Sequence, residues 1–147
     1  MVSIGKLSRA TGVKSPTIRY YEQIGLLPEP ERNNGGQRTY GAADERRLRF
    51  VRHARELGFS LEDIRELATL SEDTTQSCAI VDDIATRQLY EVKKRITQLE
   101  ALETELQRML DQCSSNTVRD CRVIQVLGDH SLCLTEHRAT YDEEKFR

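Results

Sequence analysis

The sequence has no tryptophan, and aromatic residues make up only 5% of its 147 residues. Proline occurs three times, always within the first thirty positions. No apolar run is long enough to span a membrane and nothing resembles a signal peptide, so we expect a cytoplasmic protein without a membrane partner. A chain with so few aromatic residues and 31% charged residues has little apolar surface with which to form one large core. This composition favours a small domain with an extended helix.

Residues 78–113 contain neither proline nor glycine, which marks one long helix. Apolar residues recur there at steps of three or four, except where Glu103 interrupts: Leu89, Val92, Ile96, Leu99, Leu106 and Leu110. Charged residues fill the remaining positions, so we predict a dimerisation helix over residues 78–112 with one apolar seam, as in a coiled coil. At 1.5 Å per residue it is about 50 Å long, so Cys78 and Cys113 cannot meet within one chain. In an antiparallel homodimer they can.

The first residues predict two short helices joined by a tight turn. Ser3 is a candidate N-cap and Gly12 a stop; Ser15 is a second cap with Pro16 at the first helical position, and this helix ends near Gly25. Such a pair is a helix-turn-helix. Around the second helix lie cations, hydroxyls and flat rings suited to phosphates and base edges: Lys14, Thr17, Arg19, Tyr20 and Tyr21. Many small helical domains carry such a pair without binding nucleic acid, so the pattern alone leaves both interpretations open.

A hairpin follows, because residues 33–36 read Asn-Asn-Gly-Gly and supply positive-φ turn positions. Arg32, Arg38 and Tyr40 flank the turn, as in a wing that grips the DNA backbone; the alternative is a solvated loop. A third helix over residues 42–57 carries five arginines, with Leu48, Val51, Ala54 and Leu57 predicted inward, and a fourth begins after the capping residue Ser60. We therefore predict a winged helix-turn-helix domain over residues 1–70 and a linker over residues 71–77.

Charge is distributed unevenly along the chain, although the total is only −2. Residues 1–70 hold twelve Lys and Arg against nine Asp and Glu, whereas residues 71–147 hold ten against fifteen. The basic first part weakly favours an anionic partner.

Four cysteines in a protein expected in the cytosol favour thiols over disulfides. Cys113 and Cys121 bracket seven residues between the long helix and a short helix over residues 120–127, and Cys121 lies near that helix's N-terminus, where the dipole favours a thiolate. Two or three thiolates suit a soft or borderline cation, although cysteines in helices are more often buried apolar residues. We predict a metal-binding loop and short helix over residues 113–133 and a flexible tail over residues 134–147; His130 and Cys133 are either further ligands or part of the tail.

Six segments in fixed order resemble the MerR family of bacterial transcription regulators. They are residues 4–7 (IGKL), 12–13 (GV), 17–22 (TIRYYE), 25–28 (GLLP), 38–40 (RTY) and 57–64 (LGFSLEDI). The resemblance is dense over residues 1–70. It implies a mainly α fold, with a winged helix-turn-helix on each subunit, a long antiparallel coiled-coil dimerisation helix and a short C-terminal metal-binding loop.

The resemblance also implies a function. The homodimer would bind a two-fold operator in double-stranded promoter DNA, and inducer would make it untwist the DNA so that RNA polymerase engages both promoter elements. Position by position, Arg19 and Tyr20 resemble recognition-helix contacts, and Arg38 and Tyr40 resemble wing contacts. Deforming DNA in this way requires several kcal/mol, which must come from the difference between two protein states.

Metal-responsive members of the family carry a cysteine pair that matches Cys113 and Cys121. A further position, matching Cys78, is Cys in regulators of divalent soft ions and Ser in copper-type regulators. The resemblance thus favours zinc, cadmium, lead or mercury, held by Cys113 and Cys121 of one subunit and Cys78 of the other. The net charge of the site also favours a divalent ion. Three thiolates leave a net charge of −1 with a divalent ion but −2 with a monovalent one, and burying −2 is costlier.

Other functions remain as alternatives. A copper(I), silver or gold regulator also has a loop of seven residues, and a thiol redox regulator would close a disulfide between Cys113 and Cys121. We find no His-Glu-x-x-His, phosphate loop or nucleophile elbow, so we do not expect an enzyme. A purely structural coiled-coil adaptor would not need the Arg- and Tyr-rich first domain.

Overall fold

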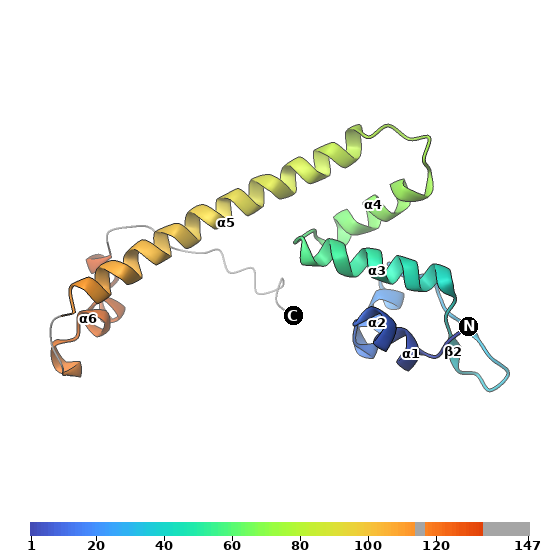
Figure 1. The fold of residues 1–147 in the computed structure, drawn as a ribbon, viewed down its shortest axis with the longest axis horizontal. Helices are drawn as coiled ribbons and strands as arrows, with labels where there is room; N and C mark the ends of the chain where they lie inside the picture. Colours follow the sequence, from blue (N-terminus) through green and yellow to red (C-terminus); the bar gives the residue numbers. More distant parts are fainter. Residues whose placement is uncertain (114–116, 134–147) are drawn as a thin grey trace. The chain divides into compact units, whose positions relative to one another are not determined.

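The computed structural model describes residues 1–113 and 117–133, and the predicted tail over residues 134–147 lies outside them. The fold is mainly helical, as predicted (Figure 1). Its contacts define two units, Met1–Gln88 and Leu89–Arg147. The elements in chain order are α1 (Ile4–Thr11), α2 (Ser15–Gln23), β1 (Glu31–Arg32), β2 (Arg38–Thr39), α3 (Ala42–Glu56), α4 (Leu61–Glu72), α5 (Ala79–Asp111), η1 (Val118–Asp120), α6 (Arg122–Gly128) and η2 (His130–Leu132).

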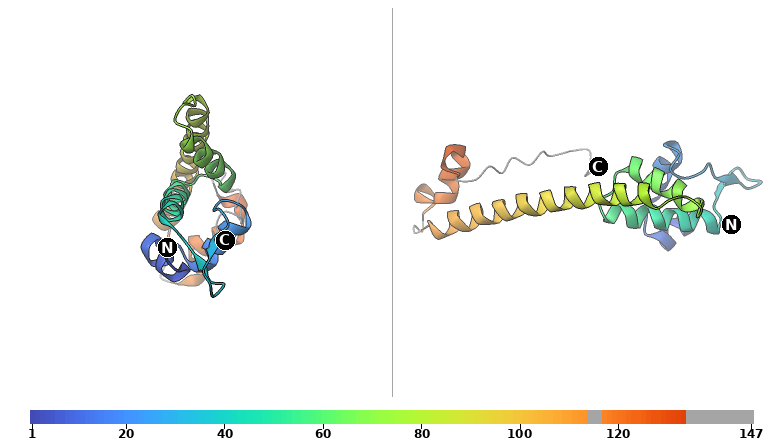
Figure 2. Two further views of the ribbon diagram at one scale, coloured as in Figure 1. Left: turned by 90° about the vertical axis from the view of Figure 1, so that its right-hand side faces the viewer. Right: turned by 90° about the horizontal axis from the view of Figure 1, so that it is seen from above.

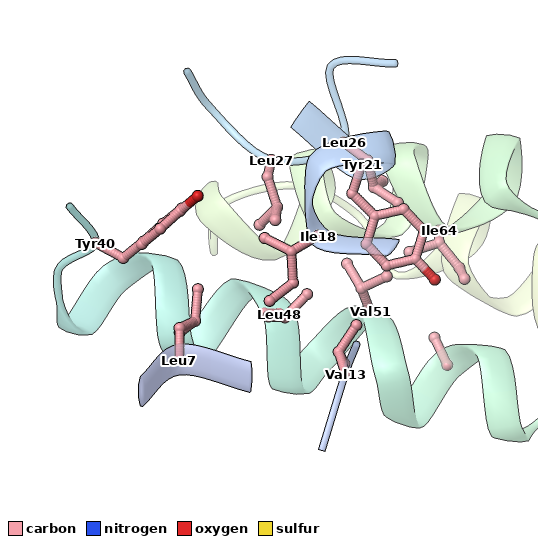
Figure 3. Packing of buried hydrophobic residues seen from close by; sticks show 11 residues of the cluster. Leu7, Val13, Ile18, Tyr21, Leu26, Leu27, Tyr40, Leu48, Val51 and Ile64 are labelled. Atoms are coloured by element: carbon pink, nitrogen blue, oxygen red, sulfur yellow. The ribbon is translucent and has the colours of Figure 1, made fainter. Parts of the chain in front are cut away.

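A small apolar core joins α1 to α4 in the first unit (Figure 3). Leu7 of α1, Ile18 of α2, Leu48 and Val51 of α3, and Ile64 of α4 are all 0% exposed. Each lies on the apolar face of its helix, so burying that face fixes the helix against its neighbours. This core holds α2 in place against α3, and the opposite face of α2 stays in solvent.

Four arginines of α3 and α4 stabilise helix ends and loops. Each donates to a backbone carbonyl: Arg47 to Leu26, Arg52 to Thr11, Arg55 to Phe59 and Arg65 to Ile24. We call them the carbonyl-capping arginines. Carbonyls at the C-terminus of a helix have no partner within it, and a cation there also complements the helix dipole.

Gly12, at the end of α1, makes one of these contacts possible. Its φ is +72°, a left-handed conformation that glycine adopts without strain, and its N–H donates to the Ser8 carbonyl. A Cβ at this position would lie 2.0 Å from Arg52 Nη1. Glycine is therefore required here for the turn and for access of Arg52 to the end of α1.

Two local predictions are wrong. The N-cap of α2 is Lys14, not Ser15, and Ser15 already has helical geometry because Pro16 fits the first turn equally well one position later. Leu57, predicted to face the core, is 56% exposed, because α3 ends at Glu56 and the chain has left the helical repeat. The predicted cap of α4 is confirmed, since Ser60 Oγ accepts from the Asp63 N–H at 3.1 Å.

The predicted hairpin is present, with very short strands. β1 and β2 pair antiparallel, Glu31 with Thr39 and Arg32 with Arg38. Asn33 Oδ1 accepts from the backbone N–H groups of Gly35 and Gln37, each at 3.0 Å, which closes the turn. At the other end of the hairpin an isolated bridge joins Val2 and Tyr40.

The second unit consists of the later turns of α5 with a short C-terminal segment beside the end of that helix (Figures 1 and 2). The predicted seam of α5 is open to solvent in the single chain, since Val92 is 38% exposed and Leu99 63%. Met109 of α5 and Val126 of α6 are buried. None of the described helices has both the length and the apolar content that crossing a membrane requires.

Candidate nucleic-acid interface and metal centre

The solvent side of α2 presents a basic and aromatic surface. Lys14 and Arg19 are exposed, Tyr20 is 47% exposed, and Thr17 is half-buried beside them. Neither cation forms an ion pair within residues 1–113 and 117–133. Unpaired cations and a ring on a rigid helix are suited to phosphates and the edges of bases.

Tyr21 does not belong to this surface. It is 8% exposed, and its ring lies in the core beside Val51 and Ile64 (Figure 3). Burial raises the pKa of its hydroxyl, partly offset by Arg55. The prediction that Tyr21 contacts a partner is therefore wrong: in the adjacent pair the core takes Tyr21 and leaves Tyr20 in solvent, because successive helical residues point in different directions.

Glu22 joins α2 to the hairpin, a role that the sequence did not predict. Its carboxylate accepts from the Tyr40 hydroxyl at 2.5 Å and from Arg38 Nε at 3.2 Å. The Glu22 side chain is only 9% exposed, and Tyr40 is 2% exposed. Burial and the hydrogen bond to Glu22 place the pKa of Tyr40 well above its usual range. The sequence feature that could have indicated this role is that Glu22 is the one acidic residue in a helix with cationic and aromatic residues.

The two predicted hairpin contacts therefore differ. Tyr40 is buried, so its ring cannot reach a nucleic acid, and this prediction is corrected to an internal role. Arg38 retains 36% exposure of its side chain and is held by Glu22 at the edge of the hairpin. Of these two, Arg38 is the one placed to meet a phosphate. Arg32, which was also predicted on the wing, is exposed and donates to the Gly36 carbonyl at 2.8 Å.

The third helix offers fewer cations than its sequence suggests. Three of its arginines donate to carbonyls, as described above, and Arg49 pairs with Glu45 at 2.8 Å. Arg46 is exposed. Four of the five arginines of α3 therefore make contacts within the protein.

The sulfur atoms of Cys113 and Cys121 lie 3.7 Å apart, and both residues are half-buried. Cys113 follows the last turn of α5, and Cys121 is the N-cap of α6. The pKa of the Cys121 thiol is lowered, first by the backbone N–H of Ile124 and then by the neighbouring Cys113 thiol. In the contact between the two sulfurs, either thiol can be the donor. A favoured thiolate with a second thiol beside it is the start of a metal-binding set.

The sulfur separation can be compared with known coordination geometry. Two thiolates at about 2.3 Å from a tetrahedral zinc ion lie about 3.8 Å apart, whereas a linear site with the same bond length separates them by about 4.6 Å. A disulfide would require about 2.05 Å. The pair therefore fits two corners of a tetrahedral or trigonal site, and it needs at least one further ligand.

Cys78 lies in the first unit. It is exposed and directly precedes α5, and its carbonyl accepts the first helical hydrogen bond, from Asp82, at 2.9 Å. No group of three or more His, Cys, Asp or Glu side chains gathers around a common point in the described part of the chain. His130 is exposed and Cys133 half-buried, and neither joins the pair in such a group.

Two family comparisons cover most of the chain. Residues 2–70 match "MerR HTH family regulatory protein", and residues 45–109 match "MerR, DNA binding". Among curated proteins, the transcriptional regulator HmrR of Rhizobium leguminosarum bv. viciae is 41% identical over 128 residues, covering 87% of this chain and 98% of HmrR. The regulator ZntR of Escherichia coli K12 is 38% identical over 130 residues, covering 86% and 92%.

A solved structure is similar over nearly the same extent. The transcription regulator PbrR691 from Ralstonia metallidurans CH34, in complex with lead(II), is 33% identical with a TM-score of 0.72. The match covers 86% of this chain and 99% of that one.

Proposed function

This chain belongs to the MerR family of transcription regulators, which are DNA-binding proteins and not enzymes, and from that premise we propose that it senses a soft divalent metal ion. It would act in the cytoplasm as a homodimer on a two-fold operator in promoter DNA. The observation that carries this proposal is the pair Cys113 and Cys121, with sulfurs 3.7 Å apart. The lead-bound structure at 33% identity and the likeness to ZntR support it.

Dimerisation would use the seam of α5. The apolar residues of this seam are exposed in the single chain; Val92, at 38%, is the least exposed and Leu99, at 63%, the most. Covering them would stabilise a pair of helices. An antiparallel pair sets the start of one helix beside the end of the other. Cys78 of the partner subunit would then join Cys113 and Cys121, and the incomplete pair would become a set of three.

The ion would supply positive charge that binds the thiolates together. Three thiolates leave a net −1 around a divalent ion and −2 around a monovalent one, which favours zinc, cadmium, lead or mercury in a partly buried site. Cys121 is prepared for this role, because the Ile124 N–H and the Cys113 thiol already stabilise its thiolate. Copper(I) is the competing inducer, and it would not need Cys78.

DNA contact would fall to Lys14, Thr17, Arg19 and Tyr20 on α2 and to Arg38 on the hairpin. We assign residues 1–70 to DNA binding, 71–77 to a linker, 78–112 to dimerisation and 113–133 to metal binding. The ion would favour one of two dimer states, and the difference in free energy between them would untwist the promoter for RNA polymerase.

Metal analysis of the purified, reduced protein tests the proposal. We expect one divalent ion per site in the wild type, and Cys78→Ser should weaken zinc(II) binding by at least about 10-fold, whereas Cys133→Ser, the matched control, should leave it unchanged. Tight copper(I) binding that survives Cys78→Ser would assign the protein to the copper branch. Absence of metal together with a reversible disulfide between Cys113 and Cys121 would support redox sensing instead.

A further inference from the structure

A chain of polar contacts runs along the last turns of α5 and reaches the segment beyond the thiol pair. The Glu105 carboxylate accepts from Arg108 Nη2 at 2.7 Å and from Nε at 3.3 Å. The same Nη2 donates to the Leu132 carbonyl at 2.9 Å, 24 residues along the chain. Gln112 Oε1 accepts from Arg108 Nη1 at 3.4 Å and from Arg122 Nε at 3.0 Å. We call this set of contacts the Arg108 clasp.

The burial of Glu105 is unusual for this helix. Its neighbour Leu106 is 57% exposed although it is apolar, whereas Glu105 is 3% exposed. A carboxylate is seldom buried unless a cation and hydrogen bonds compensate it. Arg108, with 17% side-chain exposure, provides that compensation, and its second contact is to the Leu132 backbone. The burial of the acid is therefore linked to the docking of the C-terminal segment.

The clasp also lies next to both thiols in the sequence. Gln112 directly precedes Cys113, and Arg122 directly follows Cys121, so the bond between Gln112 and Arg122 joins the two ends of the intervening loop. That contact adds to the one between Arg108 and the Leu132 carbonyl in holding the two ends together. A loop of that length closes readily but does not by itself fix the distance between two side chains.

We propose that Glu105 and Arg108 are positioning residues that hold Cys113 and Cys121 at the separation an ion requires, before the ion binds. This rests on the thiol site of the proposed function. Neither residue needs to touch the ion: Arg108 acts through the Leu132 backbone and through Gln112. Preorganisation of this kind raises affinity, because the ion does not have to order the loop when it binds.

Zinc(II) affinity, measured by competition with a chromophoric chelator, tests the clasp in the full-length protein. We expect Arg108→Met to bind zinc(II) about 10–100-fold more weakly than wild type, in the range seen when outer-shell partners of a metal site are lost. Arg95→Met is the matched control, since Arg95 is an exposed arginine on the same helix. Helix content by circular dichroism establishes folding. Equal affinities for Arg108→Met and Arg95→Met would overturn the proposal.

The single substitution Arg108→Met removes one cation from beside the buried Glu105 and can unfold the segment. The double variant Glu105→Gln, Arg108→Met removes both charges and guards against that result. If it folds and still binds zinc(II) as weakly as the single variant, the clasp is supported. If the double variant regains wild-type affinity, the effect came from the Glu105 charge in the absence of Arg108, and the positioning role is wrong.

A probe that needs no metal separates this proposal from the metal-sensing function. Phenylarsine oxide condenses with two neighbouring thiols, forming two As–S bonds and releasing one water. In a Cys78→Ser, Cys133→Ser background only Cys113 and Cys121 remain, and we expect Arg108→Met to weaken capture about 10-fold. Capture by the parent, together with a wild type that binds none of zinc(II), cadmium(II), lead(II) and mercury(II), would refute the proposed divalent-metal sensing and leave the clasp standing. Equal capture with and without Arg108 would refute the clasp.

Discussion

Replacing Glu22 with alanine should loosen the hairpin from α2 and destabilise the first unit. The Tyr40 hydroxyl, in a residue 2% exposed, would lose a charge-assisted hydrogen bond of 2.5 Å. Such a bond is worth about 1.5–3 kcal/mol when its loss leaves a buried donor. The pair with Arg38 adds at most about 1 kcal/mol, because the Arg38 side chain is 36% exposed and screened by water. We therefore expect the free energy of unfolding to fall by about 2–4 kcal/mol.

The assay is urea unfolding followed by far-ultraviolet circular dichroism, since the chain has no tryptophan. Protein concentration must be held constant, because the stability of a dimer depends on it. A double-mutant cycle of Glu22→Ala with Tyr40→Phe should give a coupling free energy of about 1–3 kcal/mol. Glu45→Ala is the control, since its pair with Arg49 is exposed on both sides, and it should change stability by less than about 0.5 kcal/mol.

A coupling free energy below about 0.5 kcal/mol would refute this account of the hairpin. So would a Glu22→Ala protein as stable as Glu45→Ala. Operator affinity gives a second readout: Glu22 faces inward, yet its loss should weaken DNA binding because Arg38 would no longer be held at the edge of the hairpin.

Three shorter predictions concern the other surfaces. Arg19→Ala should abolish the operator footprint at moderate salt. Binding measured at lower salt should show a salt slope reduced by about 2, because a homodimer loses one cation from each subunit, while Arg95→Ala leaves both unchanged; unaltered affinity for Arg19→Ala would contradict the α2 assignment. Leu99→Glu should raise the dimer dissociation constant at least about 100-fold in sedimentation experiments, because it buries a charge in the seam, and Thr97→Glu, off the seam, should not. Alkylation of Cys121 by iodoacetamide should reach half its maximal rate at lower pH in the folded chain than in urea, because its pKa is lowered and the thiolate is the reacting form. Cys113→Ser should shift that midpoint upward only in part, since the Ile124 N–H remains, and identical midpoints in both solvents would contradict the prediction.

Helical periodicity and turn residues were sufficient to predict the main elements of the fold. The spacing of Leu48, Val51 and Ala54 identified the inward face of α3, and the Asn-Gly cluster identified the hairpin. These features depend on residues close together in the sequence. The limits appeared at helix ends, where one residue decides the outcome: Leu57 keeps the apolar character of the repeat but lies just beyond it.

The residue types at the candidate sites could be predicted from the sequence, but which of those side chains are exposed and which are buried could not. The sequence indicated which side chains suit DNA, but not that Tyr21 and Tyr40 are taken by the interior, because that depends on which helices pack together. Glu22 was overlooked for the same reason, since its partner Tyr40 is 18 residues away. Likewise the cysteine spacing predicted a thiol pair, whereas the partly buried contact of Arg108 with Leu132 required the folded chain.

The carbonyl-capping arginines change how this protein should respond to random mutagenesis. Arg52 reaches the end of α1 with a planar, five-donor group, and a lysine would deliver the same formal charge through a single flexible ammonium. In a library scored for promoter occupancy, substitutions at Arg47, Arg52, Arg55 and Arg65 should therefore lower occupancy as the loss of a phosphate contact would. Unlike the loss of a phosphate contact, their relative effects on occupancy should not change at elevated salt. Counting the lysines and arginines in the sequence would therefore overestimate how many cations of this protein contact the operator.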